Sequence, residues 1–378
     1  ELFEYGERSM APAADREEVL ARVAGRRTLG PRIATLAQRA RAALRGLDRS
    51  IDAKPFLVGS GFGSLPDDAK YPGLVKVFVD AQRDYLEDRV YMLAAVLVGP
   101  GGEEEVVEIA SAPPDTASER ALLVAWMGRL LPALGSAGGA PEAPVHVYLF
   151  DRRGQRSLLD ALARHFDALC AIPAFYDLLT SRPALSQGMI SFLADEVRER
   201  MNLAPVCQNL YQVASEMGFR WDDGELAARS TFGARIFDNR RPYERDPEMG
   251  TFRRTETAGD AAVWVEASSR FGVEVPLEYA YAAWGRLGDA GVVDRDQLRP
   301  FQGVSIEDIA ALGIARCRAL RHVEARFPVK NRRVEKIALA LDRLDDVRAT
   351  GERPPFRRSL EDFLLLEHHA SRQELLLH

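Results

Sequence analysis

Acidic side chains at the ends of two predicted strands are the residues of this chain whose types and spacing could do chemistry. The run 74–82 (LVKVFVDAQ) carries Asp80 near its end and Gln82 two residues later, and the run 145–150 (VHVYLF) leads into Asp151. Carboxylate oxygens are the ligands that Mg²⁺ prefers. Several that converge can hold the cations that activate water and stabilise the leaving oxygen in phosphodiester hydrolysis. Strand-terminal Asp residues are also common as turn and cap residues, so each one alone has a second interpretation.

Other acids extend this set of candidate metal ligands. Asp84 comes two residues after Gln82 and lies on the same strand face if the strand continues. Gln82 weakens the set, because an amide supplies an oxygen but no negative charge. The loss of one of about four carboxylates weakens the binding of a divalent cation by several kcal/mol at low dielectric. The candidates in chain order are Asp80, Asp84, Asp151, Asp177, Asp195, Glu196 and Asp308.

The order of the predicted elements places Asp80 beside Asp151. Three hairpin-linked strands, a crossover helix and a fourth strand form an RNase H-like topology, in which the ends of strands one and four are adjacent. We therefore expect an α/β fold with an RNase H-like mixed sheet, three antiparallel strands plus a parallel one, with flanking and appended helices. The predicted elements are strands 75–80, 90–98 and 105–110, helix 118–134, strand 145–150 and helix 155–169.

The remainder of the chain is predicted to be mainly helical. Ser305 followed by Asp308 predicts an N-cap with an acid in the first helical turn. The stretch 232–260 is polar and is expected to be irregular. Three parts are expected: an N-terminal helical segment (1–58), an RNase H-like domain with helical insertions (73–330) and C-terminal helices (331–378). The predicted helices are 16–25, 31–46, 189–201, 209–218, 277–287, 305–327, 332–347 and 360–377.

A basic stretch at 316–336 has eight Lys and Arg residues against two Glu, although the whole chain has a formal net charge of -6. This local excess indicates either a solvated helix face or a nucleic-acid contact. Arginines also dominate one face of the predicted helices 16–25 and 31–46, with the same two interpretations. The candidate nucleic-acid-binding residues are Arg316, Arg318, Arg321, Arg332 and Arg333.

Composition and missing motifs exclude several classes. Charged residues at 28% and hydrophobic residues at 47% are typical of a soluble globular protein. No apolar run reaches the roughly 18 residues of a membrane span, so no membrane partner is expected. Three widely spaced cysteines without a CxxC pair favour a reducing cytoplasm. The motifs GxxxxGK[ST], GxSxG and HExxH do not occur. The absence of a starting Met leads us to expect a piece of a longer polypeptide.

Six stretches, taken together and in order, resemble a known family. The chain is similar to the RNase H-like predicted RecB-family nuclease module that precedes superfamily 1 helicases in bacteria. The matching stretches are QRARAALRG (38–46), KVFVDAQRDYLEDRVYMLAAVLVG (76–99), VHVYLFDRR (145–153), APVCQNLYQVASEMGFRW (204–221), VPLEYAYAAWGRL (275–287) and SLEDFLLLEHHA (359–370).

The resemblance implies a metal-dependent nuclease in DNA processing, repair or defence, with Mg²⁺ or Mn²⁺ as cofactor. Its expected partners are single-stranded DNA and a helicase domain of the same or a partner chain. By this resemblance Asp80, Asp151 and Asp195 are the catalytic residues, and Asp308 is a weaker match to a final acid. Gln82 departs from the usual Glu and puts catalysis in question. The alternative is a catalytically inactive module that binds nucleic acid or docks a protein, and so positions the helicase.

Overall fold

The structure, a computed structural model, describes residues 21, 25, 30–47, 63–69, 71–139, 143, 145–172, 175, 190–203, 208–221, 239–245, 252–254, 264–268, 274–290, 303–328 and 332. The chain divides into two compact units. We call them the five-stranded unit (Phe62–Leu193, Gly224–Thr231 and Glu274–His378) and the three-stranded unit (Glu1–Gly61, Ala194–Asp223 and Phe232–Val273). These units cut across the expected domain 73–330, because two of its segments group with the N-terminal residues.

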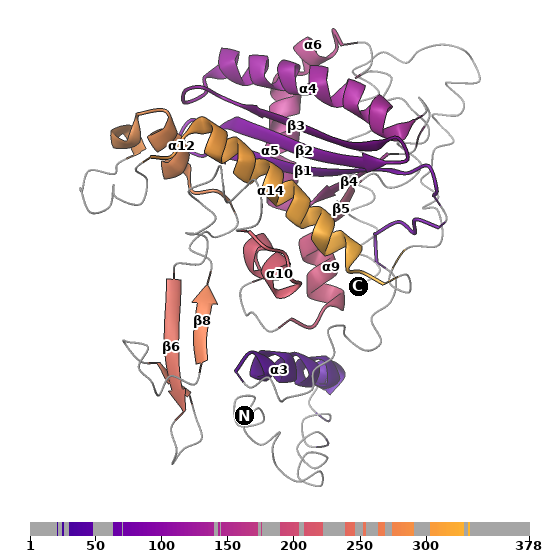
Figure 1. Ribbon diagram of the computed structural model, residues 1–378, viewed down its shortest axis with the longest axis vertical. Coiled ribbons are helices and arrows are strands. Elements are labelled where there is room, and N and C mark those ends of the chain that lie inside the picture. Colours follow the sequence, from indigo (N-terminus) through magenta and orange to yellow (C-terminus); the bar gives the residue numbers. More distant parts are fainter. Residues whose placement is uncertain are drawn as a thin grey trace. The chain divides into compact units, whose positions relative to one another are not determined.

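A mixed sheet forms the centre of the five-stranded unit. Its order is β3-β2-β1-β4-β5 (Figure 1). Neighbours β1–β2 and β2–β3 are antiparallel, whereas β1–β4 and β4–β5 are parallel. An α/β fold with a mixed sheet is therefore confirmed. The strands are β1 (Val75–Asp84), β2 (Arg89–Gly99), β3 (Gly102–Ile109), β4 (Val145–Leu149) and β5 (Ile190–Phe192).

Strand β2 is apolar along nearly its whole length because helices cover both faces of the sheet. The burial of β2 is continuous from Val90 to Leu97 rather than alternating. Strand β3 lies at the sheet edge and carries Glu103, Glu104, Glu105 and Glu108. Charged side chains on an edge strand oppose its pairing with other chains.

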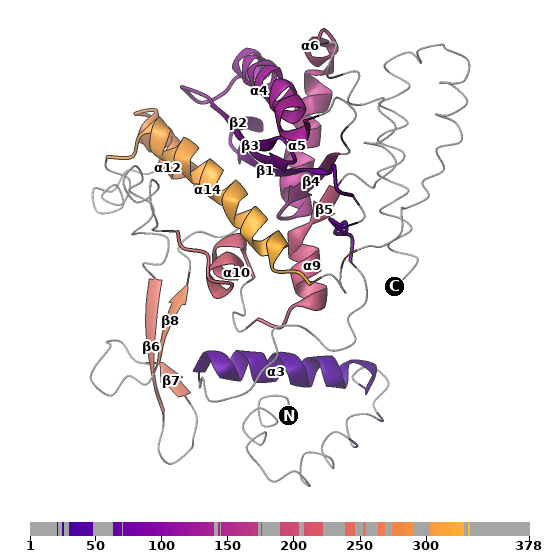
Figure 2. The same ribbon diagram turned by 45° about the vertical axis from the view of Figure 1, so that its right-hand side comes forward.

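Two sets of helices cover the sheet. Helices α4 (Thr116–Gly138) and α5 (Arg152–Arg164) pack on one face, and α14 (Ile306–Ala325) crosses the other (Figures 1 and 2). Successive side chains of β1 point to opposite faces of the sheet. Accordingly, the even-numbered Asp80 contacts α14 on one face, and the odd-numbered Val75 lies close to α4 on the other. Helix α14 comes close because Gly313 has no side chain: a Cβ there would lie 3.3 Å from Ala94 Cβ. Short helices α6 (Phe166–Leu169) and α12 (Leu277–Ala283) and the 3₁₀ helix η2 (Leu287–Ala290) complete the helices described in this unit.

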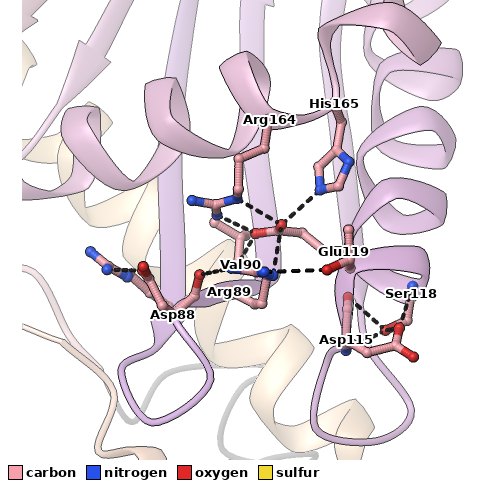
Figure 3. Close-up of polar contacts among 10 residues, drawn as sticks. Asp88, Arg89, Val90, Asp115, Ser118, Glu119, Arg164 and His165 are labelled. Atoms are coloured by element: carbon pink, nitrogen blue, oxygen red, sulfur yellow. Dashed lines mark hydrogen bonds and ion pairs between the residues drawn. The ribbon is translucent and has the colours of Figure 1, made fainter.

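A buried carboxylate joins α4 and the end of α5 to the start of β2 (Figure 3). Glu119 Oε1 accepts from Val90 N at 2.7 Å and from Arg164 Nη2 at 2.6 Å. Its Oε2 accepts from Arg164 Nε at 3.1 Å and lies 2.7 Å from His165 Nε2. Arg89 Nε lies 3.6 Å from the same oxygen. The side chain of Glu119 is fully buried, so these donors compensate its charge inside the protein.

Helix α4 is long and apolar enough to cross a membrane by length and composition. Its apolar side chains, such as Leu123 and Trp126, are instead buried in the helix–sheet layer. Helix α4 is therefore a core helix of the five-stranded unit.

The three-stranded unit holds η1 (Gly30–Arg32), α3 (Ile33–Leu47) and a second sheet of order β7-β6-β8. It also contains α9 (Leu193–Arg200), apart from its first residue, and α10 (Leu210–Glu216). Asn209 caps α10 by accepting from Gln212 N at 2.9 Å. The strands are β6 (Asn239–Arg245), β7 (Phe252–Arg254) and β8 (Trp264–Ser268), and both pairings are antiparallel.

Two sequence predictions about the elements were wrong. The stretch 189–201 was predicted to be one helix, but it begins with strand β5, which adds a second parallel strand. A strand of three residues is too short to show the alternation of apolar and polar residues that identifies a strand. Its pairing with a neighbouring strand therefore decides its conformation. The stretch 232–260 was predicted to be irregular, but it contains β6 and β7. Pro242 within β6 argues against a strand from the sequence alone.

Most other predicted helices are present. The expected helices 31–46, 209–218, 277–287 and 305–327 correspond to α3, α10, α12 and α14, and the expected 155–169 is divided into α5 and α6. The predicted helix 360–377 lies outside the described residues. Of the predicted helices 16–25 and 332–347, the structure describes only residues 21, 25 and 332.

Candidate functional site

The candidate site lies where β1 runs past the carboxyl end of β4. These parallel strands pair with Phe78 opposite Tyr148. Asp80 therefore lies level with Phe150, one residue before Asp151. The sheet brings the two acids to nearly the same level, as expected from the element order. The strand predicted to end at Asp80 instead continues to Asp84, because it stays paired with β2 beyond that residue.

Asp80 is held by an arginine from a distant part of the sequence. Arg316 Nη2 lies 2.9 Å from Asp80 Oδ1, and Arg316 Nε donates to Oδ2 at 2.9 Å. This is a two-pronged guanidinium–carboxylate pair, the strongest geometry for such an interaction. Both residues are buried, with 6% of Asp80 and 3% of Arg316 exposed.

Gln82 completes the contacts of Asp80. Its Nε2 donates to Asp80 Oδ2 at 2.8 Å, and its Oε1 accepts from Val275 N at 2.9 Å. The amide therefore uses both of its functions, and only 1% of the residue is exposed. A Glu at this position has no proton to donate when ionised.

Glu274 is a site residue that the sequence analysis missed. Burial raises the pKa of its carboxyl above the usual range. Arg153 opposes this shift, Asp151 adds to it, Arg316 opposes it and Asp80 adds to it. Glu274 thus lies within electrostatic reach of Asp80 and Asp151 and of two arginines. Glu274 stands in no motif, so nothing in its sequence spacing identifies it.

The remaining predicted ligands in the five-stranded unit have structural partners. Asp84 Oδ2 accepts from Tyr281 Oη at 2.9 Å, while its Oδ1 accepts from Leu86 N at 2.8 Å in the β1–β2 turn. Burial, as the larger cause, and the hydrogen bond to Asp84 raise the pKa of the Tyr281 phenol.

Two other candidate acids sit at helix starts. Asp151 is the N-cap of α5 and accepts from Arg153 N and Gly154 N, each at 3.0 Å. Asp308 forms a capping box with Ser305 at the start of α14: Ser305 N donates to Asp308 Oδ2 at 3.0 Å, and Asp308 N donates to Ser305 Oγ at 3.2 Å. The predicted cap at Ser305 is confirmed.

Two further candidates belong to the three-stranded unit, in the first turn of α9. Asp195 forms an ion pair with Arg198, and Glu196 Oε2 lies 3.0 Å from Arg200 Nη1. Each of these two acids therefore has an arginine partner on its own helix. Asp177 lies outside the described residues.

The predicted nucleic-acid-binding arginines divide into two groups. Arg316 and Arg332 are buried and paired with Asp80 and Glu324, which gives them interior structural contacts. Arg318 and Arg321 are exposed on α14, where they pair with Glu105 and Glu103 of β3 at 2.7 and 2.6 Å. Arg333 lies outside the described residues.

The candidate acids, as they are arranged, do not fit a divalent cation. Both oxygens of Asp80 already accept charge-assisted or amide hydrogen bonds, and a buried guanidinium repels a second cation at that position. In the part of the chain that the structure describes, no three His, Cys, Asp or Glu side chains are grouped so as to hold a metal ion. The predicted Mg²⁺ or Mn²⁺ cofactor therefore stays a prediction that this donor set does not favour.

Comparison with known proteins adds no family to this description. No protein-family model, curated protein or solved structure matches the chain. The resemblance to the RecB-family nuclease module stays a prediction.

Proposed function

We propose that this chain is an RNase H-like, cytoplasmic module of a nuclease–helicase protein that binds nucleic acid without cutting it. The proposal that the module does not cut depends on one observation, the buried ion pair of Asp80 with Arg316. Asp80 matches the first metal-binding acid of such a nuclease, and here Arg316 occupies it. Gln82 supports the same conclusion, because its amide stabilises the pair where the family has a Glu.

The sheet supports the RNase H-like part of the proposal. Three hairpin-linked strands, a crossover through α4 and a parallel fourth strand follow the topology expected from the sequence. In the resulting order β3-β2-β1-β4-β5, only β2 runs against the others. Asp80 of β1 lies beside the carboxyl end of β4, at the end of the sheet where the family's metal ligands are expected.

Exposed arginines beside this end of the sheet support nucleic-acid binding. Arg152, Arg153 and Arg156 are exposed in the first turns of α5, directly after Asp151. Among the described residues, Arg156 contacts Asp160, at a long distance of 3.8 Å. Guanidinium groups on one exposed turn can bind successive phosphates, and such contacts make binding salt-dependent. Arg318 and Arg321 could bind phosphates as well only after releasing their glutamate partners.

The test combines cleavage and binding with the purified chain and labelled single-stranded DNA. We expect no degradation in Mg²⁺ or Mn²⁺ and binding that weakens steeply with salt. Changing Arg153 and Arg156 to Ala is expected to lower the salt slope by roughly one for each phosphate that the variant no longer binds. Arg120→Ala is the matched control, since Arg120 is an exposed arginine on the neighbouring α4, paired with Asp167 at 3.1 Å.

Metal-dependent cleavage that Asp80→Asn abolishes would overturn the non-cleaving proposal. Absence of any salt-sensitive binding would instead favour the docking alternative, in which the module positions a helicase through protein contacts.

A further inference from the structure

Two neighbouring ion pairs join α14 to the edge strand β3. Arg318 Nε lies 2.7 Å from Glu105 Oε1, and Arg321 Nη1 lies 2.6 Å from Glu103 Oε2. All four side chains reach solvent, with 33% to 46% of each exposed. Glu104, between the two acids, is instead bonded to α4 on the other face of the sheet. Glu103 and Glu105 therefore share the face of β3 that α14 covers.

The spacing of these two acids is similar to the spacing of phosphates on a nucleic-acid strand. Side chains two residues apart on a β-strand lie about 6.6 Å apart along it, which is close to the separation of successive phosphates on an extended single strand. Arg318 and Arg321 are three residues apart and are therefore neighbours on one face of α14. A carboxylate, like a phosphate, offers a guanidinium a charged oxygen. Glu103 and Glu105 thus present to the two arginines the charges of two consecutive phosphates.

These pairs can open, because exposed pairs of Arg and Glu contribute little to stability. The pair of Arg316 with Asp80 on the same helix is buried and has no such freedom. A strand that displaces Glu103 and Glu105 leaves both carboxylates beside its own phosphates, where the like charges repel. The glutamates therefore weaken the binding of a strand to this surface without abolishing it.

We propose that Arg318 and Arg321 form a second contact for single-stranded DNA, and that Glu103 and Glu105 keep it closed by standing in for two phosphates. The inference rests on the proposed nucleic-acid-binding function. It concerns α14, on the face of the sheet opposite to the exposed arginines of α5. Its test compares glutamate variants with one another, so it can fail while wild type still binds.

The experiment measures the binding of a labelled oligothymidylate over a range of salt concentrations. Glu103→Gln/Glu105→Gln keeps the size of both side chains and removes their charges. We expect this double variant to bind about threefold to tenfold more tightly than wild type at low salt, because two exposed ion pairs no longer have to be broken. The plot of log affinity against log salt should become steeper by about 1.4, since each added phosphate contact to a single strand contributes about 0.7.

Glu104→Gln/Glu108→Gln is the matched control, because it removes the same charge from the same strand on the face that packs against α4. Arg129, the partner of Glu108, also donates to Val107 O at 2.9 Å, so it stays bound to β3. We expect a gain of about twofold or less from this variant, through net charge alone. Thermal unfolding checks that each variant keeps the fold.

Removal of the arginines completes the test. Arg318→Gln/Arg321→Gln should change the binding of wild type little, because the contact is closed, but should remove the gain of Glu103→Gln/Glu105→Gln. A glutamate variant that gains no more than the control, or that keeps its gain without the two arginines, overturns this inference and leaves the proposed function standing. An equal loss on removing the arginines from wild type shows that the contact is already open and also overturns it. If no protein of the series binds, both proposals fail.

Discussion

The side-chain amide of Gln82 donates to Asp80 Oδ2 at 2.8 Å, and the carbonyl oxygen of the same amide accepts from Val275 N at 2.9 Å. This one side chain thereby links the end of β1 to the segment that precedes α12. An amide can make both contacts at once, whereas an ionised carboxylate can make only the second. The residue that departs from the nuclease pattern is thus fitted to its present surroundings.

Gln82→Glu is expected to destabilise the protein in the absence of metal by about 2–4 kcal/mol, because it removes a buried donor and places two carboxylates together. Gln82→Met removes both hydrogen bonds without adding charge, and about 1–3 kcal/mol is expected. Urea unfolding in EDTA measures both. The difference between the two variants should shrink in acid, where the carboxylates take up protons. A Glu variant as stable as wild type in EDTA contradicts this account of Gln82.

Glu119→Gln is expected to destabilise the fold by about 3–5 kcal/mol, because the donors of Arg164, Val90 and His165 surround a fully buried carboxylate (Figure 3). A Gln amide presents hydrogen atoms to some of these donors. Urea unfolding at neutral pH measures the loss. Glu108→Gln, which changes an exposed pair with Arg129 on β3, serves as the control and should alter stability by about 1 kcal/mol or less.

The same carboxylate predicts a dependence on pH. Burial raises the pKa of Glu119, but hydrogen bonds from Arg164, Val90 and His165 outweigh burial, so the pKa lies below its ordinary 4.5. A lowered pKa in the folded state gives stability that is present above about pH 4.5 and is lost as the pH falls through the folded value. Unfolding measured from pH 7 down to pH 3 should therefore show a smaller acid loss in Glu119→Gln than in wild type. Equal slopes would contradict this assignment.

Asp308→Ala is expected to cost about 1 kcal/mol through loss of the capping box on α14, with no effect on any response to metal. Ser305→Ala removes the partner of the same box and should cost a similar amount. Because the two residues act together, the double variant should lose less than the sum of the single losses. If EDTA destabilises wild type but leaves Asp308→Ala unchanged, Asp308 is a metal ligand and the cap is secondary.

The sequence predicts the central sheet well because local signals and burial agree there. The run 89–99 is apolar on both faces from Val90 to Val98, which a covered central strand explains, and the run 74–82 is apolar at every odd-numbered position. Strand β5 is not predicted because its three residues are too few to show an alternating pattern. Strand β6 is not predicted because it is charged and contains Pro242. In both cases pairing with a distant strand decides the conformation.

The candidate site shows the same division between local and distant information. Asp151 can be predicted because it comes just after its strand, and Asp80 because it comes directly after the apolar run 77–79, although β1 continues to Asp84; strand order then brings them together. Arg316 and Glu274 cannot be predicted, since they lie 236 and 194 positions beyond Asp80 and reach it only through tertiary packing. Arg316 belongs to a basic stretch that suggests a solvated or nucleic-acid-binding surface, and only its burial identifies it as the partner of Asp80.

The turn between β2 and β3 gives a final prediction, which concerns packing. A Cβ at Gly99 would lie 2.3 Å from Ala137 O, and one at Gly101 would lie 2.1 Å from Ser136 O. These are backbone atoms at the end of α4, so they cannot move aside as a side chain can. Gly99→Ala is therefore expected to cost about 3 kcal/mol or more and to loosen α4 from the sheet. Thermal unfolding and hydrogen exchange of α4 measure both effects.

Gly128→Ala is the matched control and is expected to have the opposite sign. Gly128 is exposed within α4, and nothing lies within 4 Å of the position that its Cβ would take. Alanine in a helix interior is favoured over glycine by about 0.5–1 kcal/mol, because it reduces the freedom of the unfolded chain. If both variants destabilise the protein equally, α4 does not tolerate substitution in general, and the close approach at Gly99 is not the cause. If Gly99→Ala is neutral, the contact between the β2–β3 turn and the end of α4 does not hold the helix on the sheet.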